Sequence, residues 1–198
     1  MITQFIPATF QELLELLARY DVPIHTWGKG RAKTVLELWH EVQTDGVYFE
    51  DRGDGILYRV ARSVRIFVFS RLEDGRVQNL RECQASADGT LTERALPGRA
   101  SMSETVRPNE EWIAAVLRAV AEELGIQGVD VSEFLIWDED ATDIHTSKAY
   151  PGLTTHNAYA RVIWSMSRTW FKTFYWSLER ALLSVVFYWY ETEETADA

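Results

Sequence analysis

The chain has 198 residues, and its 30 acidic and 20 basic side chains give a net charge of −10. This length suffices for one domain with a sizeable core and falls short of two ordinary domains. The negative charge disfavours broad binding to nucleic acid or to an anionic membrane, because such binding needs a positive electrostatic field. A phosphorylated ligand would therefore require a local group of basic side chains or a divalent cation.

Cysteine usage and the first residues indicate the cellular compartment. Cys83 is the single cysteine and excludes an internal disulfide, and the start lacks the charged and apolar regions of a signal peptide. We therefore expect a cytoplasmic protein. The most apolar segment, Ala181 to Tyr190, is about half the length of a membrane-spanning helix, so we expect a buried strand there and no membrane segment.

Two helices are predicted near the start of the chain. Apolar residues at helical spacing predict a helix from Thr9, as its N-cap, to Tyr20, and a second helix from Ala32 to Val42. A Gly-rich turn before the second helix carries Lys29, Arg31 and Lys33. This segment is either an ordinary turn or an anion site, in which Lys29 and Arg31 would bind a phosphorylated ligand beside free backbone N–H groups.

The middle and the end of the chain have the pattern of strands. From Ile56 to Leu96 the apolar residues alternate, and Asp74-Gly75 and Asp88-Gly89 predict hairpin turns. Further strands are expected over 134–137, 158–164, 171–176 and 184–190. The pattern predicts an α+β domain in which one central helix packs on a mixed sheet.

The central helix is expected to run from Asn109, as its N-cap, to a stop at Gly125. Its apolar stripe, which should face the sheet, consists of Ile113, Val116, Leu117, Val120 and Leu124.

An acidic pair, Glu122 and Glu123, is predicted on the opposite side of this helix. Ala119 and Ala115 are expected between the two glutamates, one and two turns earlier. Taken alone, a Glu-Glu pair near a helix end is typical of a solvated face.

The spacing around this helix resembles the box that defines the Nudix hydrolase superfamily. The matching positions are Glu110, Arg118, Val120, Glu122, Glu123, Gly125 and Ile126. Ala119 stands where the family has its catalytic glutamate, and Glu104 stands where it has its first glycine. An upstream Leu96-Pro97-Gly98 also resembles the segment that precedes the box. The chain therefore resembles a divergent branch with a degenerate box.

The resemblance implies a fold and a domain organisation. We expect a Nudix-type α/β/α sandwich with a mixed β-sheet and an N-terminal helical extension. The extension would span 1–54, the Nudix-like domain 55–191, and an acidic disordered tail 192–198.

The resemblance also implies chemistry. Nudix hydrolases bind Mg²⁺ through the box glutamates, and the metal bridges a diphosphate and activates a water. By this resemblance Glu122 and Glu123 are metal ligands and, with Arg118, catalytic residues, and Arg118 would orient Glu122 through an i, i+4 ion pair. Ala119 supplies no oxygen, so either another carboxylate substitutes or hydrolysis is lost. The acids expected within reach are Glu104, Asp138, Glu139 and Asp140.

Three further segments resemble this branch. They are Trp27 to Thr34, Trp39-His40-Glu41, and Ser147 to Thr155 with its Tyr-Pro-Gly-Leu signature. Tyr150-Pro151-Gly152 is interpreted either as a tight turn or as a ligand-binding loop in which Tyr150 stacks on a base or sugar.

Two functions follow from these features. The first is a divergent Nudix-fold protein that binds, and slowly hydrolyses with Mg²⁺, a nucleoside diphosphate-linked compound. The alternative is a catalytically inactive protein-interaction module. Its C-terminal aromatic residues, Phe187 to Tyr190, would contact a second copy in a homodimer or another protein partner. Direct RNA binding would need a basic stripe around Lys29, Arg31 and Lys33, which the net charge opposes.

Overall fold

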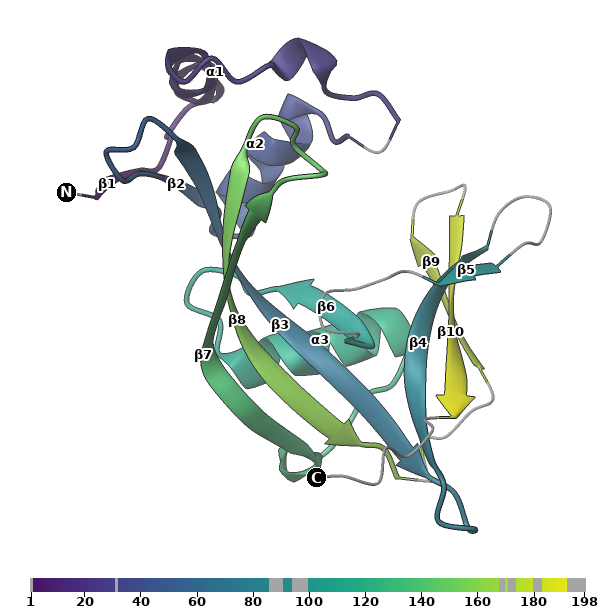
Figure 1. Ribbon diagram of the computed structural model, residues 1–198. Coiled ribbons are helices and arrows are strands. Elements are labelled where there is room, and N and C mark those ends of the chain that lie inside the picture. Colours follow the sequence, from purple (N-terminus) through teal and green to yellow (C-terminus); the bar gives the residue numbers. More distant parts are fainter. Residues whose placement is uncertain are drawn as a thin grey trace. The chain divides into compact units, whose positions relative to one another are not determined.

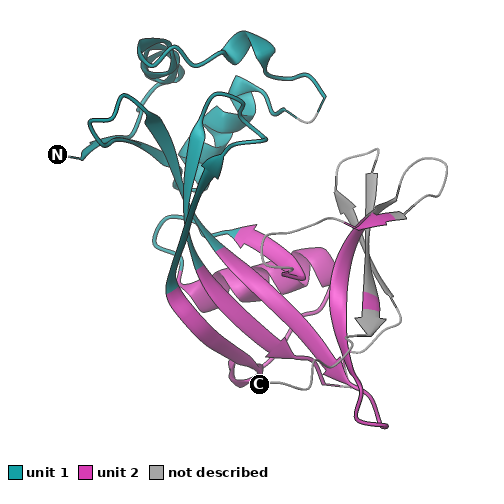
Figure 2. Ribbon diagram, in the orientation of Figure 1, with its two compact units in different colours: residues 1–63, 105–110, 140–159 teal, residues 64–104, 111–139, 160–198 magenta. Residues whose placement is uncertain are grey.

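The computed structural model describes residues 2–30, 32–85, 91–93, 100–167, 170, 174–179 and 183–191 (Figure 1). Within these, only the backbone is described at 84–85, 91, 174–179, 183–188 and 190–191. The chain divides into two compact units (Figure 2). Unit 1 contains residues 1–63, 105–110 and 140–159, and unit 2 contains residues 64–104, 111–139 and 160–198.

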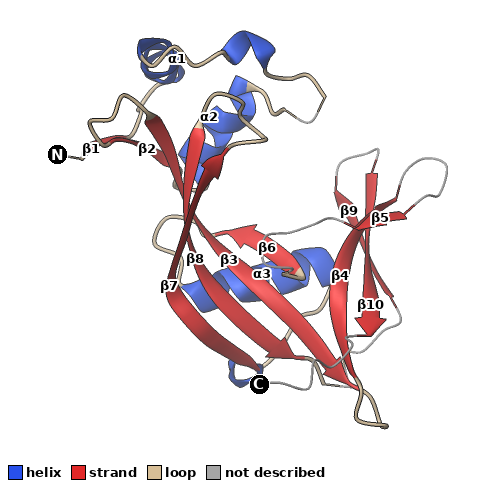
Figure 3. Ribbon diagram, in the orientation of Figure 1, coloured by secondary structure: helices blue, strands red, loops and turns tan. Residues whose placement is uncertain are grey.

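Helices and strands together confirm the predicted α+β class (Figure 3). The elements that lie wholly in unit 1 are β1 (Thr3–Phe5), α1 (Phe10–Arg19), η1 (Ile24–Thr26), α2 (Val35–Thr44) and β2 (Tyr48–Asp51). Three long strands contribute residues to both units, namely β3 (Leu57–Arg71), β7 (Phe134–Thr146) and β8 (Thr154–Ser165).

The remaining elements belong to unit 2, except for the last residue of β6. They are β4 (Val77–Ala85), β5 (Leu91–Glu93), β6 (Met102–Thr105), α3 (Trp112–Leu124), η3 (Val131–Glu133), β9 (Phe174–Glu179) and β10 (Leu183–Glu191). Over the described residues, no helix is both long and apolar enough to cross a membrane.

The strands hydrogen-bond in the order β1-β2-β3-β4-β10-β9. Off this path, β5 pairs with β4, β6 and β8 pair with β3, and β7 pairs with β8. The neighbouring pairs along the path are antiparallel, as is β4 with β5. The C-terminal strand β10 therefore lies between two partners, β4 and β9.

Side-chain caps fix where the first two helices begin. The Thr9 hydroxyl accepts a hydrogen bond from the Glu12 N–H at 3.1 Å, which confirms the predicted N-cap of α1. Thr34 and Glu37 form a reciprocal capping box at the start of α2. The second helix therefore begins after Thr34 and not at Ala32, because the box satisfies N–H groups that the first turn of a helix leaves without an intrahelical partner.

The core of unit 1 is made by apolar side chains from both helices, from strands β2 and β3, and from loops. Its fully buried members include Leu13 and Leu17 of α1, Leu38 of α2, Phe49 of β2, and Tyr150 and Leu153. The Tyr-Pro-Gly-Leu segment is thus part of this core.

Most predicted strands and turns are present. Gly75 has φ +88°, and the Leu72 N–H bonds to the Arg76 carbonyl at 2.8 Å, which confirms the first hairpin turn. The second predicted turn, Asp88-Gly89, and Leu96-Pro97-Gly98 lie outside the described residues, as do 171–173 of the third later strand. Strands β7, β8, β9 and β10 cover the described parts of the four later predictions.

Candidate functional site

Helix α3, which carries the box residues, presents a different face to the interior of unit 2 than its apolar pattern predicts. The buried residues are Ala115, Val116, Ala119, Val120 and Leu124, and the helix contacts β9. Ala119 is 0% exposed, whereas Ile113 and Leu117 are only partly buried. The prediction that Ala115 and Ala119 lie on the acidic side was therefore wrong. Small alanine side chains let a helix approach its neighbours closely, so they face inward here.

The two ends of α3 show one confirmed and one wrong prediction. Gly125 ends the helix in the left-handed conformation, with φ +66°, as predicted. Asn109 is not the N-cap, because Glu111 occupies that position without a side-chain hydrogen bond. Asn109 instead has φ +60° in a turn, where the Glu110 N–H bonds to the Arg107 carbonyl. Asparagine tolerates this conformation better than most residues, which explains its place outside the helix.

The acidic pair lies in the last turn of α3. The Glu122 side chain is 54% exposed, and Glu123 is partly buried. Arg118 Nη1 lies 3.8 Å from Glu122 Oε2, so the predicted i, i+4 ion pair is present at a long distance.

Glu104 is the closer partner of Arg118. Its Oε1 lies 3.0 Å from Arg118 Nη1, and both side chains are largely buried. Glu104 belongs to strand β6, and it stands where the Nudix box has its first glycine. Glu104 is one of the four acids that the sequence predicts within reach of the box, and the structure places it beside Arg118. Asp138 pairs instead with Arg161 at 3.8 Å, Glu139 is exposed on β7, and Asp140 belongs to unit 1.

These residues provide a limited set of metal ligands. Within the described part of the chain, no group of three or more His, Cys, Asp or Glu side chains is placed to hold a metal ion. Glu122 and Glu123 can offer carboxylate oxygens, which suit a hard cation such as Mg²⁺. The position of Ala119 adds no ligand and is closed to solvent.

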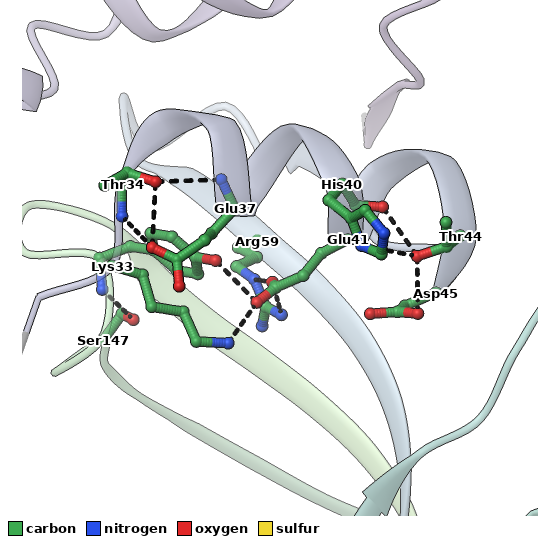
Figure 4. A network of polar contacts seen from close by, with 10 residues as sticks. Lys33, Thr34, Glu37, His40, Glu41, Thr44, Asp45, Arg59 and Ser147 are labelled. Carbon is green, nitrogen blue, oxygen red and sulfur yellow. Dashed lines mark hydrogen bonds and ion pairs between the residues drawn. The ribbon is translucent and has the colours of Figure 1, made fainter. Parts of the chain in front are cut away.

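A second polar constellation, centred on Glu41 of α2, lies within unit 1 (Figure 4). Glu41 is 8% exposed, and its Oε1 accepts hydrogen bonds from Lys33 Nζ at 2.7 Å and from the Tyr150 hydroxyl at 2.6 Å. Its Oε2 accepts two bonds from the Arg59 guanidinium, at 2.5 and 3.2 Å. One buried carboxylate thus joins α2 to β3 and to the Tyr150 loop.

The charges of this network stabilise one another. Burial by itself raises the pKa of Glu41, but the charges of Arg59 and Lys33 and the hydrogen bonds outweigh it and hold this pKa below its ordinary value. Burial and the neighbouring Glu41 carboxylate raise the pKa of Tyr150 far above its ordinary value, so this phenol stays a donor. Among the described residues, every buried side-chain nitrogen and oxygen has a hydrogen-bond partner.

The three segments beyond the box that resemble the divergent branch meet at this network. Trp27 Nε1 donates to the Pro151 carbonyl at 2.8 Å, and its ring centroid lies 5.2 Å from that of Tyr150. The Lys33 N–H donates to the Ala149 carbonyl at 2.8 Å. The sequence marks each segment separately, but nothing in their spacing shows that Glu41 joins them.

The predicted ligand-binding residues lie in different surroundings. Tyr150 is 1% exposed, and a Leu153 N–H to Tyr150 carbonyl bond closes its turn, with Gly152 at φ +91°. This geometry agrees with the tight-turn interpretation, and Tyr150 serves the packing of unit 1. Lys29 is exposed in the Gly-rich turn, and Arg31 lies outside the described residues.

The C-terminal aromatic run occupies β10. Phe187 and Tyr188 pair with Glu82 and Arg81 of β4, and Trp189 is partly buried. The side chains of Phe187, Tyr188 and Tyr190 lie outside the described residues, so the predicted aromatic surface stays a prediction.

Comparisons with known proteins give similarities in fold alone. No family model and no curated protein matches the chain. Solved structures similar to it include the Ap4A hydrolase of C. elegans, at 17% identity and TM-score 0.32, covering 67% of this chain and 80% of that one. A NUDIX-family hydrolase from Clostridium perfringens has 15% identity and TM-score 0.36, with 70% and 85% covered. The MERS1–GDP complex of T. brucei has 14% identity and TM-score 0.32, with 84% and 52% covered. At these values the similarities assign no activity.

We predict that Glu41→Gln lowers the free energy of unfolding by about 3 kcal/mol, because it leaves Arg59 and Lys33 without their buried counter-charge. Urea unfolding at neutral pH measures the loss. Glu15→Gln, on the exposed side of α1, is the matched control and should change stability by less than about 0.5 kcal/mol. An equal loss of unfolding free energy in both variants would contradict the prediction that the Glu41 network stabilises the fold.

The stability of the parent chain and that of the Glu41→Gln variant should depend differently on pH. Because the folded-state pKa of Glu41 lies below its ordinary 4.5, the stabilisation is present above pH 4.5 and is lost as pH falls through the folded value. The stability difference between the parent chain and Glu41→Gln should therefore shrink as pH falls below 4.5. Urea titrations between neutral pH and about pH 3 test this, and a constant difference would show that the carboxylate keeps its charge.

We also predict that Gly152→Ala destabilises unit 1 by more than about 2 kcal/mol. A Cβ at this position would lie 2.3 Å from Pro23 Cδ, in addition to the cost of φ +91°. Gly53→Ala isolates the conformational cost, because φ is +81° there and nothing lies within 4 Å of the added atom. Thermal and urea unfolding should show a clearly smaller loss for Gly53→Ala, and equal losses would contradict the close approach to Pro23.

Proposed function

We propose that the chain is a divergent Nudix-fold protein that binds a nucleoside diphosphate-linked compound at the acidic end of α3. The observation that carries the proposal is that Glu122 and Glu123 lie in the last turn of a helix with a buried face, and that the Glu122 side chain is 54% exposed. A helix held by packing keeps its side chains in a fixed arrangement, as a metal or ligand site requires.

The proposed roles follow from the charges of the side chains. Glu122 and Glu123 would hold Mg²⁺, which when bound would neutralise the diphosphate and activate a water. Arg118, between Glu104 at 3.0 Å and Glu122 at 3.8 Å, would orient Glu122. The exposed Lys29 supports an anion-binding role for the Gly-rich turn, with Arg31 as the second cation.

Hydrolysis by this site would be slow. Loss of a general base typically lowers a rate by about 10²–10⁴-fold, and Ala119 provides neither a base nor a metal ligand. Its burial also favours the second candidate function, an inactive interaction module that keeps the box helix as scaffold. We propose a cytoplasmic location for either function, because the single cysteine, Cys83, excludes an internal disulfide.

We expect Glu122→Gln and Glu123→Gln each to weaken Mg²⁺ binding by at least about tenfold, because each removes a carboxylate charge. Titration calorimetry with Mg²⁺ gives the affinity, and a phosphate-release screen over nucleoside diphosphate-linked compounds, including Ap4A, gives the activity. Glu111→Gln, at the other end of the same helix, is the control. Unchanged Mg²⁺ affinity in both variants, with no compound bound, would remove the proposed site and leave the interaction module.

Restoring the box glutamate should harm the fold. Ala119→Glu places a carboxylate where the native side chain is fully buried, and we expect a loss of about 2 kcal/mol or more in the free energy of unfolding. Ala114→Glu, at an exposed position of the same helix, should be nearly neutral. A stable Ala119→Glu protein with Mg²⁺-dependent turnover would show instead that this face of α3 opens to the ligand.

A further inference from the structure

The part of β7 that belongs to unit 2, residues 134–139, is an edge of the sheet, and we call it the β7 edge. β7 pairs with β8 and, among the described residues, with no other strand. Edge strands in natural proteins are commonly protected by charged residues, proline or bulges. The run Phe134-Leu135-Ile136-Trp137 has neither a charge nor a proline.

Side chains alternate along this edge between the interior and solvent. The ring of Phe134 packs 5.3 Å from that of the fully buried Trp164. Leu135 and Trp137, which point to the other side, are 61% and 58% exposed. Large apolar side chains this exposed, next to each other on one strand, mark an interaction surface.

Trp137 is held in place although most of it is exposed. The Phe67 ring meets it edge to face with centroids 6.5 Å apart, and the Arg161 guanidinium lies 5.1 Å from its ring centre. A tryptophan ordered by its neighbours loses little entropy on binding, and tryptophan is enriched among the residues that dominate binding energy.

Acidic residues flank the apolar run on both sides. Asp130 and Glu133 precede it, and Asp138 and Glu139 follow it, while Arg161 offsets part of this charge through its pair with Asp138. These charges oppose a second copy as the occupant. Two-fold antiparallel pairing of two β7 edges about Ile136, which joins Leu135 of one copy to Trp137 of the other, would place Glu139 of one copy opposite Glu133 of the other, and like charges across strands are destabilising.

We propose that the β7 edge binds an extended segment of another protein that is apolar at its centre and carries Lys or Arg at both ends. The segment adds to the sheet as a strand, so its backbone N–H and carbonyl groups pair with those of β7. Its apolar side chains contact Leu135 and Trp137, and its basic ends meet the acids on either side. The net charge of −10 attracts such a partner over a longer range.

The probe is a fluorescein-labelled peptide, KKVTITVKK, whose binding to the full chain is followed by fluorescence anisotropy. The peptide EEVTITVEE has the same core with reversed ends, and KKVPIPVKK has the same charge but lacks two backbone donors. We expect the first peptide to bind at least about tenfold more tightly than either of the others. Hydrogen exchange should show added protection at residues 134–139.

Substitutions in the chain separate the contribution of the apolar contacts from that of the acidic charges. Trp137→Ala should weaken binding of the basic peptide by about 30-fold, the effect of losing a central anchor. Glu139→Lys should weaken it by about fivefold. Glu73→Lys, at the exposed hairpin turn of the same unit, changes the net charge equally and should have little effect. Circular dichroism of each variant checks the fold. Leu135→Ser is a second variant that removes an apolar contact.

Several outcomes would overturn the proposal. Equal binding of the basic and acidic peptides would remove the charge argument, and equal binding of the proline peptide would remove strand addition. A chain that is dimeric by sedimentation and becomes monomeric on Trp137→Ala would show that a second copy occupies the edge. Protection that appears away from 134–139 would place the peptide elsewhere.

Discussion

The Glu41 carboxylate is the interaction on which the structure of unit 1 depends. Removing a carboxylate from water is costly, and the cost is offset here by two cations and a phenol that converge on its two oxygens. These bonds are directional, so they fix the rotation of α2 relative to β3 and to the loop that carries Tyr150. Apolar contacts alone, such as those of Leu38 and Val42, would permit several rotations of the helix.

The polar residues of the two units have different roles. In unit 1 Lys33, Arg59 and Tyr150 converge on the buried Glu41 carboxylate, and the Tyr-Pro-Gly-Leu loop belongs to that interior. In unit 2 the carboxylate of Glu122 is presented to solvent, while Arg118 is engaged by Glu104. The sequence of this chain resembles the Nudix superfamily both around Tyr150 and along α3. The residues that carry this resemblance therefore include some that build the fold and some that we propose as ligand-binding.

Local features of the sequence predict much of the fold. The Thr9 cap, the hairpin at Asp74-Gly75 and the stop at Gly125 depend on residues close together in the chain, and the structure has all three. The N-cap of α3 was predicted wrongly because Asn109 suits both a cap and a left-handed turn. The side of α3 on which Ala119 lies was predicted wrongly. A helical projection ranks residues by hydrophobicity and gives alanine little weight, whereas close packing favours its small size.

The network around Glu41 could not be predicted, because its members are far apart in the sequence, whereas the Arg118–Glu122 pair could, because its members are one helical turn apart. One local signal was available for Glu41, which lies three residues after Leu38 and next to Val42 on the apolar side of α2. A charged residue at such a position indicates a buried partner. The identity of that partner, Arg59 or Tyr150, depends on how β3 and the loop fold back on the helix. The sequence nominates Glu104 as one of four acids near the box, but it does not single this residue out, because its contact with Arg118 depends on where β6, which pairs with β3, is placed in the sheet.

The burial of Ala119 makes the degenerate box hard to reverse. A single codon change to glutamate would place a carboxylate in a closed interior, so this change would be tolerated only after substitutions elsewhere in unit 2 had enlarged the space around α3.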